Sequence, residues 1–279
     1  MSALRPLGSL LCIAAFASAL AAQNAPVKVE LKKKLTLLAV GAHMDDAEGG
    51  MGSILISAVQ AGHRVVVVVT VSDYTTWGPT IGREAQCKAD QLALAKRFGY
   101  EKRFLDYPYH QFPADNAAKK KLAEIYNELK PDITFVHNPD DHWPDHANSG
   151  LAAKDAVLFP HGYTANLNAP RCPRVFAFCS GPNQTIKFEP DFFVDATPVM
   201  SRYLELIAGA DACLNGKPAA EQIGYEARNL KSGEVLRMSQ HGWHRYCLCV
   251  TWGAQNGGGM TYGLGLKTLW GPRDGRPLW

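Results

Sequence analysis

The stretch of residues 65–71 reads VVVVVTV and is an almost unbroken run of β-branched apolar residues. Such residues favour strands, and a strand that is apolar on both sides must be covered on both sides. Residues 35–42 and 133–137 have the same continuous apolar character. Segments with helical periodicity separate these runs, so we expect an α/β fold with a mostly parallel sheet and helices on both faces.

Weaker patterns complete the expected fold. Further strands are predicted at residues 103–107, 174–179 and 192–196, and helices at residues 50–62, 82–98, 117–129, 147–158 and 199–210. From Gly242 onward the chain is rich in Gly, Trp and Tyr and shows no clean period. His241 and His244, beside Trp243, could line the cleft, but we prefer to interpret them as part of a packed aromatic cluster. Neither an internal repeat nor a low-complexity linker is found, which favours a single domain.

The N-terminus has the pattern of an export signal. Arg5 supplies a positive charge, residues 7–19 are almost entirely apolar or small, and Ala19-Leu20-Ala21 fits a cleavage site. We therefore predict a cleavable signal peptide at residues 1–22, a mature domain at residues 23–279, and a periplasmic or secreted location. No other stretch approaches the length of a membrane span, so none is expected after cleavage.

The net charge and the cysteines limit which binding partners, disulfides and metal sites can be expected. The net charge of +3 is too small to indicate a nucleic-acid partner, and no feature predicts an oligomeric state. The chain has seven cysteines, of which Cys12 lies in the predicted signal peptide. The other six permit disulfides without selecting a pairing, and the absence of Cys-x-x-Cys argues against a thiolate zinc site. They are Cys87, Cys172, Cys179, Cys213, Cys247 and Cys249.

Two clusters of His and Asp residues follow predicted strands. His43, Asp45 and Asp46 come directly after residues 35–42, and the sequence HNPDDHWPDH occupies residues 137–146. Open parallel sheets bind ligands outside the carboxyl ends of their strands. The two clusters are therefore expected to meet at one edge of the sheet.

These residue types fit zinc. A catalytic zinc site has three nitrogen or oxygen ligands from the protein and one position for water. His43 and one of the two aspartates can supply two ligands. The other carboxylate then serves as general base for a water whose pKa the metal lowers to roughly 7. Two imidazoles and one carboxylate also suit iron, and manganese is not excluded.

The third ligand is expected from the second cluster. Pro144 fits the first turn of a helix, which places His146 in that turn and leaves His142 in the preceding loop. His146 is therefore predicted as the ligand.

The motifs resemble those of a known family. Residues 42–48, AHMDDAE, resemble the Ala-His-Pro-Asp-Asp-x-Glu signature of the PIG-L/LmbE-like zinc N-deacetylases. Residues 144–146, PDH, are similar to the end of the family's second motif, His-Pro-Asp-His. Residues 83–85 and 190–195 match other family segments in position and character. The resemblance covers roughly residues 35–210.

The resemblance implies a Rossmann-like fold and a role for each motif residue. The implied metal ligands are His43, Asp46 and His146. Asp45 is the implied general base, Arg83 contacts the substrate, and Glu48 binds substrate hydroxyls or braces the loop. Family substrates are mostly glycans and glycoconjugates that contain N-acetylglucosamine, with other small amides in some branches.

Two positions depart from the family pattern. Met44 replaces the proline of the first motif, and Trp143 replaces the first His of the second. That His is expected to stabilise the oxyanion or to protonate the leaving amine. His142 and His137 are the nearby candidates to take over, and we predict His142 as catalytic and His137 as substrate-binding.

The function predicted from the sequence is an exported zinc-dependent hydrolase that removes an acetyl group from an amide nitrogen, with an N-acetylglucosamine-type sugar or glycoconjugate as substrate. One alternative is a metallohydrolase that acts on another small amide or a peptide. The other is a carbohydrate-binding protein on the same fold, in which Trp143 has blocked catalysis.

Overall fold

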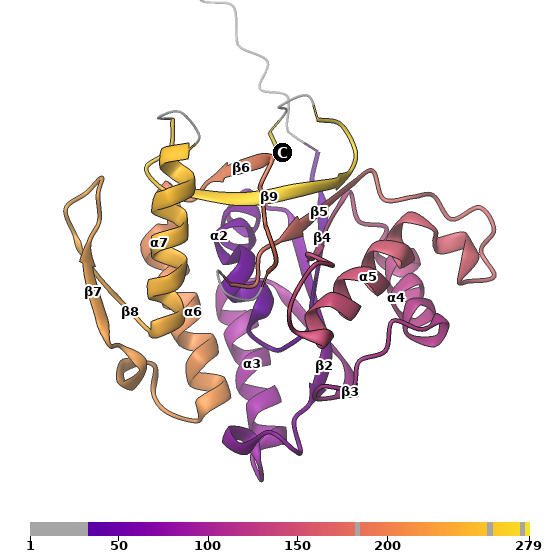
Figure 1. Ribbon diagram of the computed structural model, residues 1–279, viewed down its shortest axis with the longest axis horizontal. Coiled ribbons are helices and arrows are strands. Elements are labelled where there is room, and N and C mark those ends of the chain that lie inside the picture. The colour runs from indigo at the N-terminus through magenta and orange to yellow at the C-terminus, as the bar shows by residue number, and fades with distance from the viewer. Residues whose placement is uncertain (1–32, 182–184, 256–258, 274–276) are drawn as a thin grey trace, which may run out of the picture. The chain divides into compact units, whose positions relative to one another are not determined.

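The structure is a computed structural model that describes residues 33–181, 185–255, 259–273 and 277–279. The predicted signal peptide, residues 1–22, lies outside these described residues. In the compact unit Lys34–Trp279, seven strands form one sheet (Figure 1). They are β1 (Thr36–Gly41), β2 (Arg64–Asp73), β3 (Glu101–Pro108), β4 (Ile133–His137), β5 (Arg174–Phe178), β6 (Phe192–Asp195) and β9 (Gly263–Trp270).

The sheet is mostly parallel, as predicted. Its strand order is β3-β2-β1-β4-β5-β9-β6. The pairs β3-β2, β2-β1, β1-β4 and β4-β5 are parallel, whereas β9 runs antiparallel to both β5 and β6. The valine-rich β2 is paired on both edges and is buried from Val65 to Ser72, which explains why its sequence is apolar at consecutive positions.

Helices cover both faces of the sheet. They are α2 (Asp46–Gln60), α3 (Glu84–Phe98), α4 (Asn116–Leu129), α5 (Pro144–Leu158), α6 (Met200–Asn215) and α7 (Gln240–Gln255). Helices α4 and α5 pack together on one face, and α2, α3, α6 and α7 lie on the other (Figure 1). The prediction of a single α/β domain with a mostly parallel sheet and helices on both faces is confirmed.

The start of α2 was predicted too late. The helix begins at Asp46 and is kinked at Met51, where φ is −148° and ψ is 20°. Gly49 and Gly50 are weak helix formers, and they hide the first turn from a propensity argument. This turn matters because it carries Asp46 at the carboxyl end of β1.

The C-terminal part contains elements that the sequence pattern did not predict. These are α7, β9 and the hairpin of β7 (Tyr225–Arg228) and β8 (Val235–Met238). A Cβ atom on Gly263 would lie 2.9 Å from the backbone nitrogen of Gly253, so α7 rests directly on the backbone of β9. Glycine is depleted in strands in general, which explains why this packing left no recognisable strand signal.

Two further expectations can be compared with the described residues. The six cysteines among the described residues are all free, and four of them, Cys87, Cys172, Cys179 and Cys249, are buried. In the part of the chain that the structure describes, no helix is long and apolar enough to cross a membrane.

Close packing of α5 on β4 gives a test of the fold. A Cβ atom on Gly150 would lie 2.4 Å from the carbonyl oxygen of His137. We expect Gly150→Ala to lower the free energy of unfolding by about 1–3 kcal/mol, because α5 must move away from β4. Gly162→Ala, at a position with no atom within 4 Å of the added Cβ, is the control in urea denaturation. Equal stability of the two variants would contradict the packing described.

Candidate active site

The two His/Asp clusters meet at the carboxyl edge of β1 and β4. His43 lies in the loop between β1 and α2, and Asp46 is the first residue of α2. His146 is the third residue of α5, which begins after the loop that follows β4. Parallel strands bring these segments, about a hundred residues apart in sequence, to one edge of the sheet.

His43, Asp46 and His146 converge on one point. His43 Nδ1 lies 3.0 Å from His146 Nε2. The Asp46 carboxylate lies 3.4 Å from each of these nitrogens, through Oδ2 to His43 and through Oδ1 to His146. This spacing places the three side chains predicted as metal ligands around a common centre.

Asp145 holds His43 from the outer side. Its Oδ2 lies 3.1 Å from His43 Nε2, and it also accepts hydrogen bonds from the backbone N–H groups of His110 (2.8 Å) and Phe112 (3.1 Å). Burial would raise the pKa of Asp145, but these hydrogen bonds lower it. The carboxylate is therefore ionised and accepts the N–H of His43 Nε2.

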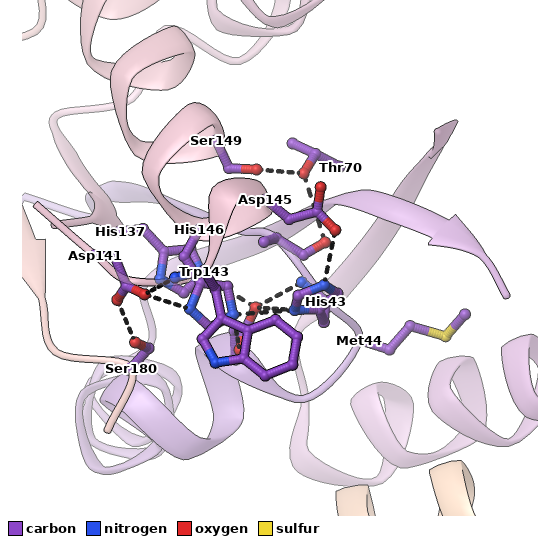
Figure 2. Close-up of polar contacts among 12 residues, drawn as sticks. His43, Met44, Thr70, His137, Asp141, Trp143, Asp145, His146, Ser149 and Ser180 are labelled. Atoms are coloured by element: carbon purple, nitrogen blue, oxygen red, sulfur yellow. Dashed lines mark hydrogen bonds and ion pairs between the residues drawn. The ribbon is translucent and has the colours of Figure 1, made fainter. Parts of the chain in front are cut away.

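Asp141 holds His146 in the same way. Its Oδ1 lies 3.2 Å from His146 Nδ1, and its Oδ2 accepts from the hydroxyls of Ser180 (2.7 Å) and Thr185 (3.1 Å). Burial opposes ionisation of Asp141, but the hydrogen bonds from His146, from the backbone N–H of Trp143 and from Ser180 together outweigh it, so that the pKa of Asp141 is lowered. Figure 2 shows Asp141 and Asp145 on opposite sides of the two imidazoles.

This pattern fits a divalent metal. Because each imidazole donates its outer N–H to a carboxylate, the inner nitrogens of His43 and His146 face each other with their lone pairs. These two nitrogen lone pairs and the Asp46 carboxylate repel one another unless a positive charge lies between them. Burial alone would lower the pKa of His43, but hydrogen bonds to Asp145 and Asp46 raise it to about 10. The centre therefore attracts a cation.

His137 lies behind this centre and does not face the cavity beside it, contrary to its predicted role in substrate binding. The ring is fully buried and stacks on His146, with centroids 4.4 Å apart and an interplanar angle of 7°. Its Nε2 lies 3.0 Å from Asp46 Oδ2. Burial lowers the pKa of His137, so the neutral ring donates this hydrogen bond and fixes Asp46.

Asp45 faces the cavity. It occupies the residue before α2, but its side chain makes no capping hydrogen bond to the helix. Burial and the charge of Asp46 raise its pKa to about 6. Its carboxylate and the three converging side chains line the same space, which is the arrangement that a general base requires.

The cavity has a volume of about 460 Å³ and walls of different chemistry. Aromatic rings from loops after β2, β3 and β4 form one wall, namely Tyr74, Trp77, Tyr109 and Trp143. Helix α6 contributes an aliphatic wall of Ile207, Ala210 and Leu214. Polar side chains that include Ser180, Asp211, Gln240, His241, His244 and Arg245 form the rest.

Trp143 lines this cavity and leaves it open. Its indole stacks on His110, with centroids 5.1 Å apart, and its edge faces His43 at 6.4 Å. The neighbouring His142 is exposed and is not among the lining residues. In the extended backbone at Trp143, consecutive side chains point in opposite directions. This explains why His142, predicted as catalytic, points away from the site.

Glu48 and Arg83 do not line the cavity in the described part of the chain. The buried Glu48 Oε1 accepts from Lys102 Nζ at 2.8 Å, and Lys102 also donates to the carbonyl oxygen of Met44. Of the two roles implied for Glu48, the geometry supports bracing the loop. Arg83 Nη1 donates to the carbonyl oxygen of Leu214 at 3.0 Å, so Arg83 holds the end of α6 instead of contacting a ligand.

Met44 has a role that the family's proline could not fill. Its backbone N–H donates to the hydroxyl of Tyr74 at 3.2 Å, whereas proline has no N–H. The departure therefore ties the first motif to the aromatic wall of the cavity.

The sequence reasoning missed Asp211 and misplaced His241. His241 Nδ1 lies 2.7 Å from Asp211 Oδ1, and single ligand atoms of Asp45, Asp211 and His241 all lie within 4.8 Å of one another. The expected aromatic cluster exists, since Trp243 stacks on Tyr225 with centroids 5.6 Å apart. His241 and His244 nevertheless line the cavity. Helix α7 positions both residues, but its sequence shows no clear helical periodicity, so the sequence did not place them in the cavity.

The buried ion pair beneath the first motif gives a second test. Lys102 and Glu48 are both fully buried, so Lys102→Met leaves an unpaired carboxylate in the core. We expect a loss of about 3–5 kcal/mol in the free energy of unfolding, and a smaller loss in Lys102→Met/Glu48→Gln. Arg237→Met, at an exposed pair with Glu226, is the control and should cost about 0–1 kcal/mol. A double variant less stable than Lys102→Met would contradict the bracing role.

Comparison with known proteins agrees with this geometry. Residues 38–157 match the family model PIG-L, described as GlcNAc-PI de-N-acetylase. The chain is 24% identical over 225 residues to 4-oxalmesaconate hydratase of Pseudomonas putida, which covers 72% of this chain and 87% of that protein. The matched family region includes both His/Asp clusters.

Solved structures share the fold. N,N'-diacetylchitobiose deacetylase of Pyrococcus horikoshii superposes with a TM-score of 0.64 at 18% identity, covering 96% of this chain and 95% of that one. The 4-carboxy-2-hydroxymuconate hydratase of Pseudomonas putida has a TM-score of 0.63 at 21% identity, covering 88% and 100%. Residues 38–157, which carry both motifs, match the PIG-L family, and the fold of the chain agrees with that match.

Proposed function

We propose that this protein is an exported zinc-dependent hydrolase that removes an acetyl group from an amide nitrogen, with an N-acetylglucosamine-type sugar or glycoconjugate as substrate. One observation carries the proposal: the Asp45 carboxylate, free of a capping role, faces the same cavity as the converging side chains of His43, Asp46 and His146. Export rests on the sequence of residues 1–22 alone.

Each residue has a defined part in the proposed reaction. His43, Asp46 and His146 would hold the metal, with Asp145 and Asp141 fixing the two imidazoles. A bound divalent ion supplies the positive charge that acidifies a water and polarises an acyl oxygen. Asp45 takes the proton from the attacking water, and the cavity wall positions the amide.

The charge of the cavity supports a neutral amide as substrate. The carboxylates of Asp45, Asp46 and Asp211 line it. Arg245 also lines it, but its guanidinium donates to the carbonyl oxygens of Cys179 and Ser180. Among the described residues that line the cavity there is no other arginine and no lysine, so an anionic substrate would lack a free guanidinium or ammonium partner.

The aromatic wall of the cavity favours a sugar as the substrate. Tyr74 and Tyr109 meet edge to face with centroids 5.6 Å apart, and Tyr109 lies 5.4 Å from His43. Flat apolar surfaces beside a few polar groups are typical of small-molecule sites, and the apolar faces of a pyranose ring can pack on such rings. The open cavity argues against the alternative in which Trp143 blocks catalysis.

A hydratase is the second candidate, because the match to 4-oxalmesaconate hydratase covers most of the chain. It would add water to a carbon–carbon double bond with the same metal and base. The lack of a free guanidinium or ammonium group in the described lining favours the deacetylase, since the hydratase among the structural neighbours is named for a carboxylate substrate. Acetate release from acetylated sugars, measured beside the loss of absorbance of a conjugated enoate, separates the two activities.

The metal site can be tested by elemental analysis. We expect about one zinc per chain in the wild type and a loss of most of it in His146→Ala, because one of three protein ligands is removed. His142→Gln, at an exposed position in the same cluster, is the control and should keep its metal. Full metal content in His146→Ala would rule out this ligand set.

The role of Asp45 gives a separate test. Asp45→Asn should retain zinc but lose turnover of an N-acetylglucosamine oligomer by roughly 100-fold or more, because the proton acceptor is removed. Asp140→Asn, at an exposed carboxylate in the second cluster, should behave as the wild type. Undiminished acetate release by Asp45→Asn would contradict the assignment of the base, whereas zinc without acetate release in the wild type would point to the hydratase.

A further inference from the structure

A second polar pair, Asp211 and His241, lines the same cavity as the proposed metal ligands. Asp211 lies on α6 and His241 in the first turn of α7, and the hydrogen bond between them is 2.7 Å long. Asp211 is buried, whereas the side chain of His241 is 61% exposed and lines the cavity. This is the arrangement of an imidazole oriented by a carboxylate, with Nδ1 bound and Nε2 turned away from the carboxylate.

The second motif of this chain provides no proton donor for the leaving amine. The family motif has a His at the position of Trp143, and neither neighbouring candidate can replace it. His142 is exposed outside the cavity, and His137 is buried behind Asp46. Apart from the two proposed metal ligands, the histidines that line the cavity in the described residues are His241 and His244. His241 is the one that is held by a buried carboxylate.

The charged groups around His241 favour its protonated form. Asp211 from α6 and Asp45 from the loop before α2 are negative, and Arg245 on the same helix opposes them. The hydrogen bond to Asp211 is the largest influence and raises the pKa of His241 to about 9. At neutral pH the imidazole therefore carries a proton that it can deliver.

We propose that His241, oriented by Asp211, is the acid that protonates the departing amine nitrogen, replacing the motif histidine lost to Trp143. The inference rests on the proposed amide hydrolysis. The water oxygen bonds to the acyl carbon while Asp45 takes one water proton. The C–N bond then breaks, its electron pair stays on nitrogen, and His241 gives nitrogen a proton.

Transfer of the proton from Asp45 to His241 restores both groups. The two residues lie close enough for this, because their ligand atoms and that of Asp211 are within 4.8 Å of one another. The net reaction adds one water to the amide and yields acetic acid and the amine, so atoms and charges balance.

The test compares substrates that differ in their need for an acid. An alkyl amide nitrogen must be protonated to leave, whereas 4-nitrophenolate leaves without a proton. For zinc-loaded His241→Gln we expect kcat/KM to fall by roughly 100-fold to 10,000-fold on an acetylated glucosamine oligomer. On 4-nitrophenyl acetate it should fall by less than about tenfold, with zinc content unchanged. His161→Gln, at an exposed position after α5, is the matched control.

Asp211→Asn provides a second readout. In the wild type, amide turnover should decline as the pH rises through the pKa of His241, because a raised pKa keeps the proton at lower pH and loses it above. Without the Asp211 carboxylate, this decline should begin at lower pH. If the decline of amide turnover at high pH is the same in Asp211→Asn as in the wild type, the orienting role of Asp211 is contradicted.

Other outcomes would overturn the inference. An equal loss on amide and ester in His241→Gln would mean that His241 does not act on the leaving group. Two metals in the wild type and one in His241→Gln would make Asp45, Asp211 and His241 a second metal site. A wild type without amide hydrolysis would end the proposed function and this inference together, whereas an active wild type with an unaffected His241→Gln would end this inference alone.

Discussion

The site depends on carboxylates that hold imidazoles from the outside. Asp145 is hydrogen-bonded to His43 at 3.1 Å, and Asp141 to His146 at 3.2 Å. These contacts orient the two rings so that His43 Nδ1 and His146 Nε2 lie 3.0 Å apart. Backbone N–H groups fix one carboxylate and hydroxyls fix the other. The geometry of the centre is thereby set by rigid elements and not by flexible side chains, which is what a metal centre requires of its surroundings.

The sequence predicted the parts of the fold that have strong local signals. The β-branched run of β2 and the apolar run of β4 are buried strands in a parallel sheet, and the clusters that follow β1 and β4 meet as expected. The register and direction of β9 could not be predicted from the sequence, because this strand is antiparallel to its neighbours and packs on α7 through glycine. The direction of His142 was missed because it depends on the backbone at Trp143. The burial of Glu48, on α2, depends on its ion pair with Lys102, on β3.

The cavity is built from two parts of the chain with different roles. The residues matched by the family model, 38–157, contain Asp45 and the three converging side chains of His43, Asp46 and His146. The aliphatic wall, Asp211 and His241 lie on α6 and α7, beyond that match. Proteins of this fold include both a deacetylase and a hydratase, as expected where the activity depends on the residues of the site and not on the fold.

The place of β9 in the sheet also affects which strands position each half of the cavity. β9 lies between β5 and β6, although it follows β6 in sequence by about 70 residues. Strands β1 to β5 pair with one another in the described sheet, whereas β6 pairs with β9 and with no other described strand. The segments that carry His43, Asp46 and His146 follow β1 and β4, which pair with each other without β9. The position of His241 depends instead on α7, which packs on β9, so the two halves of the cavity depend on different strands of the sheet.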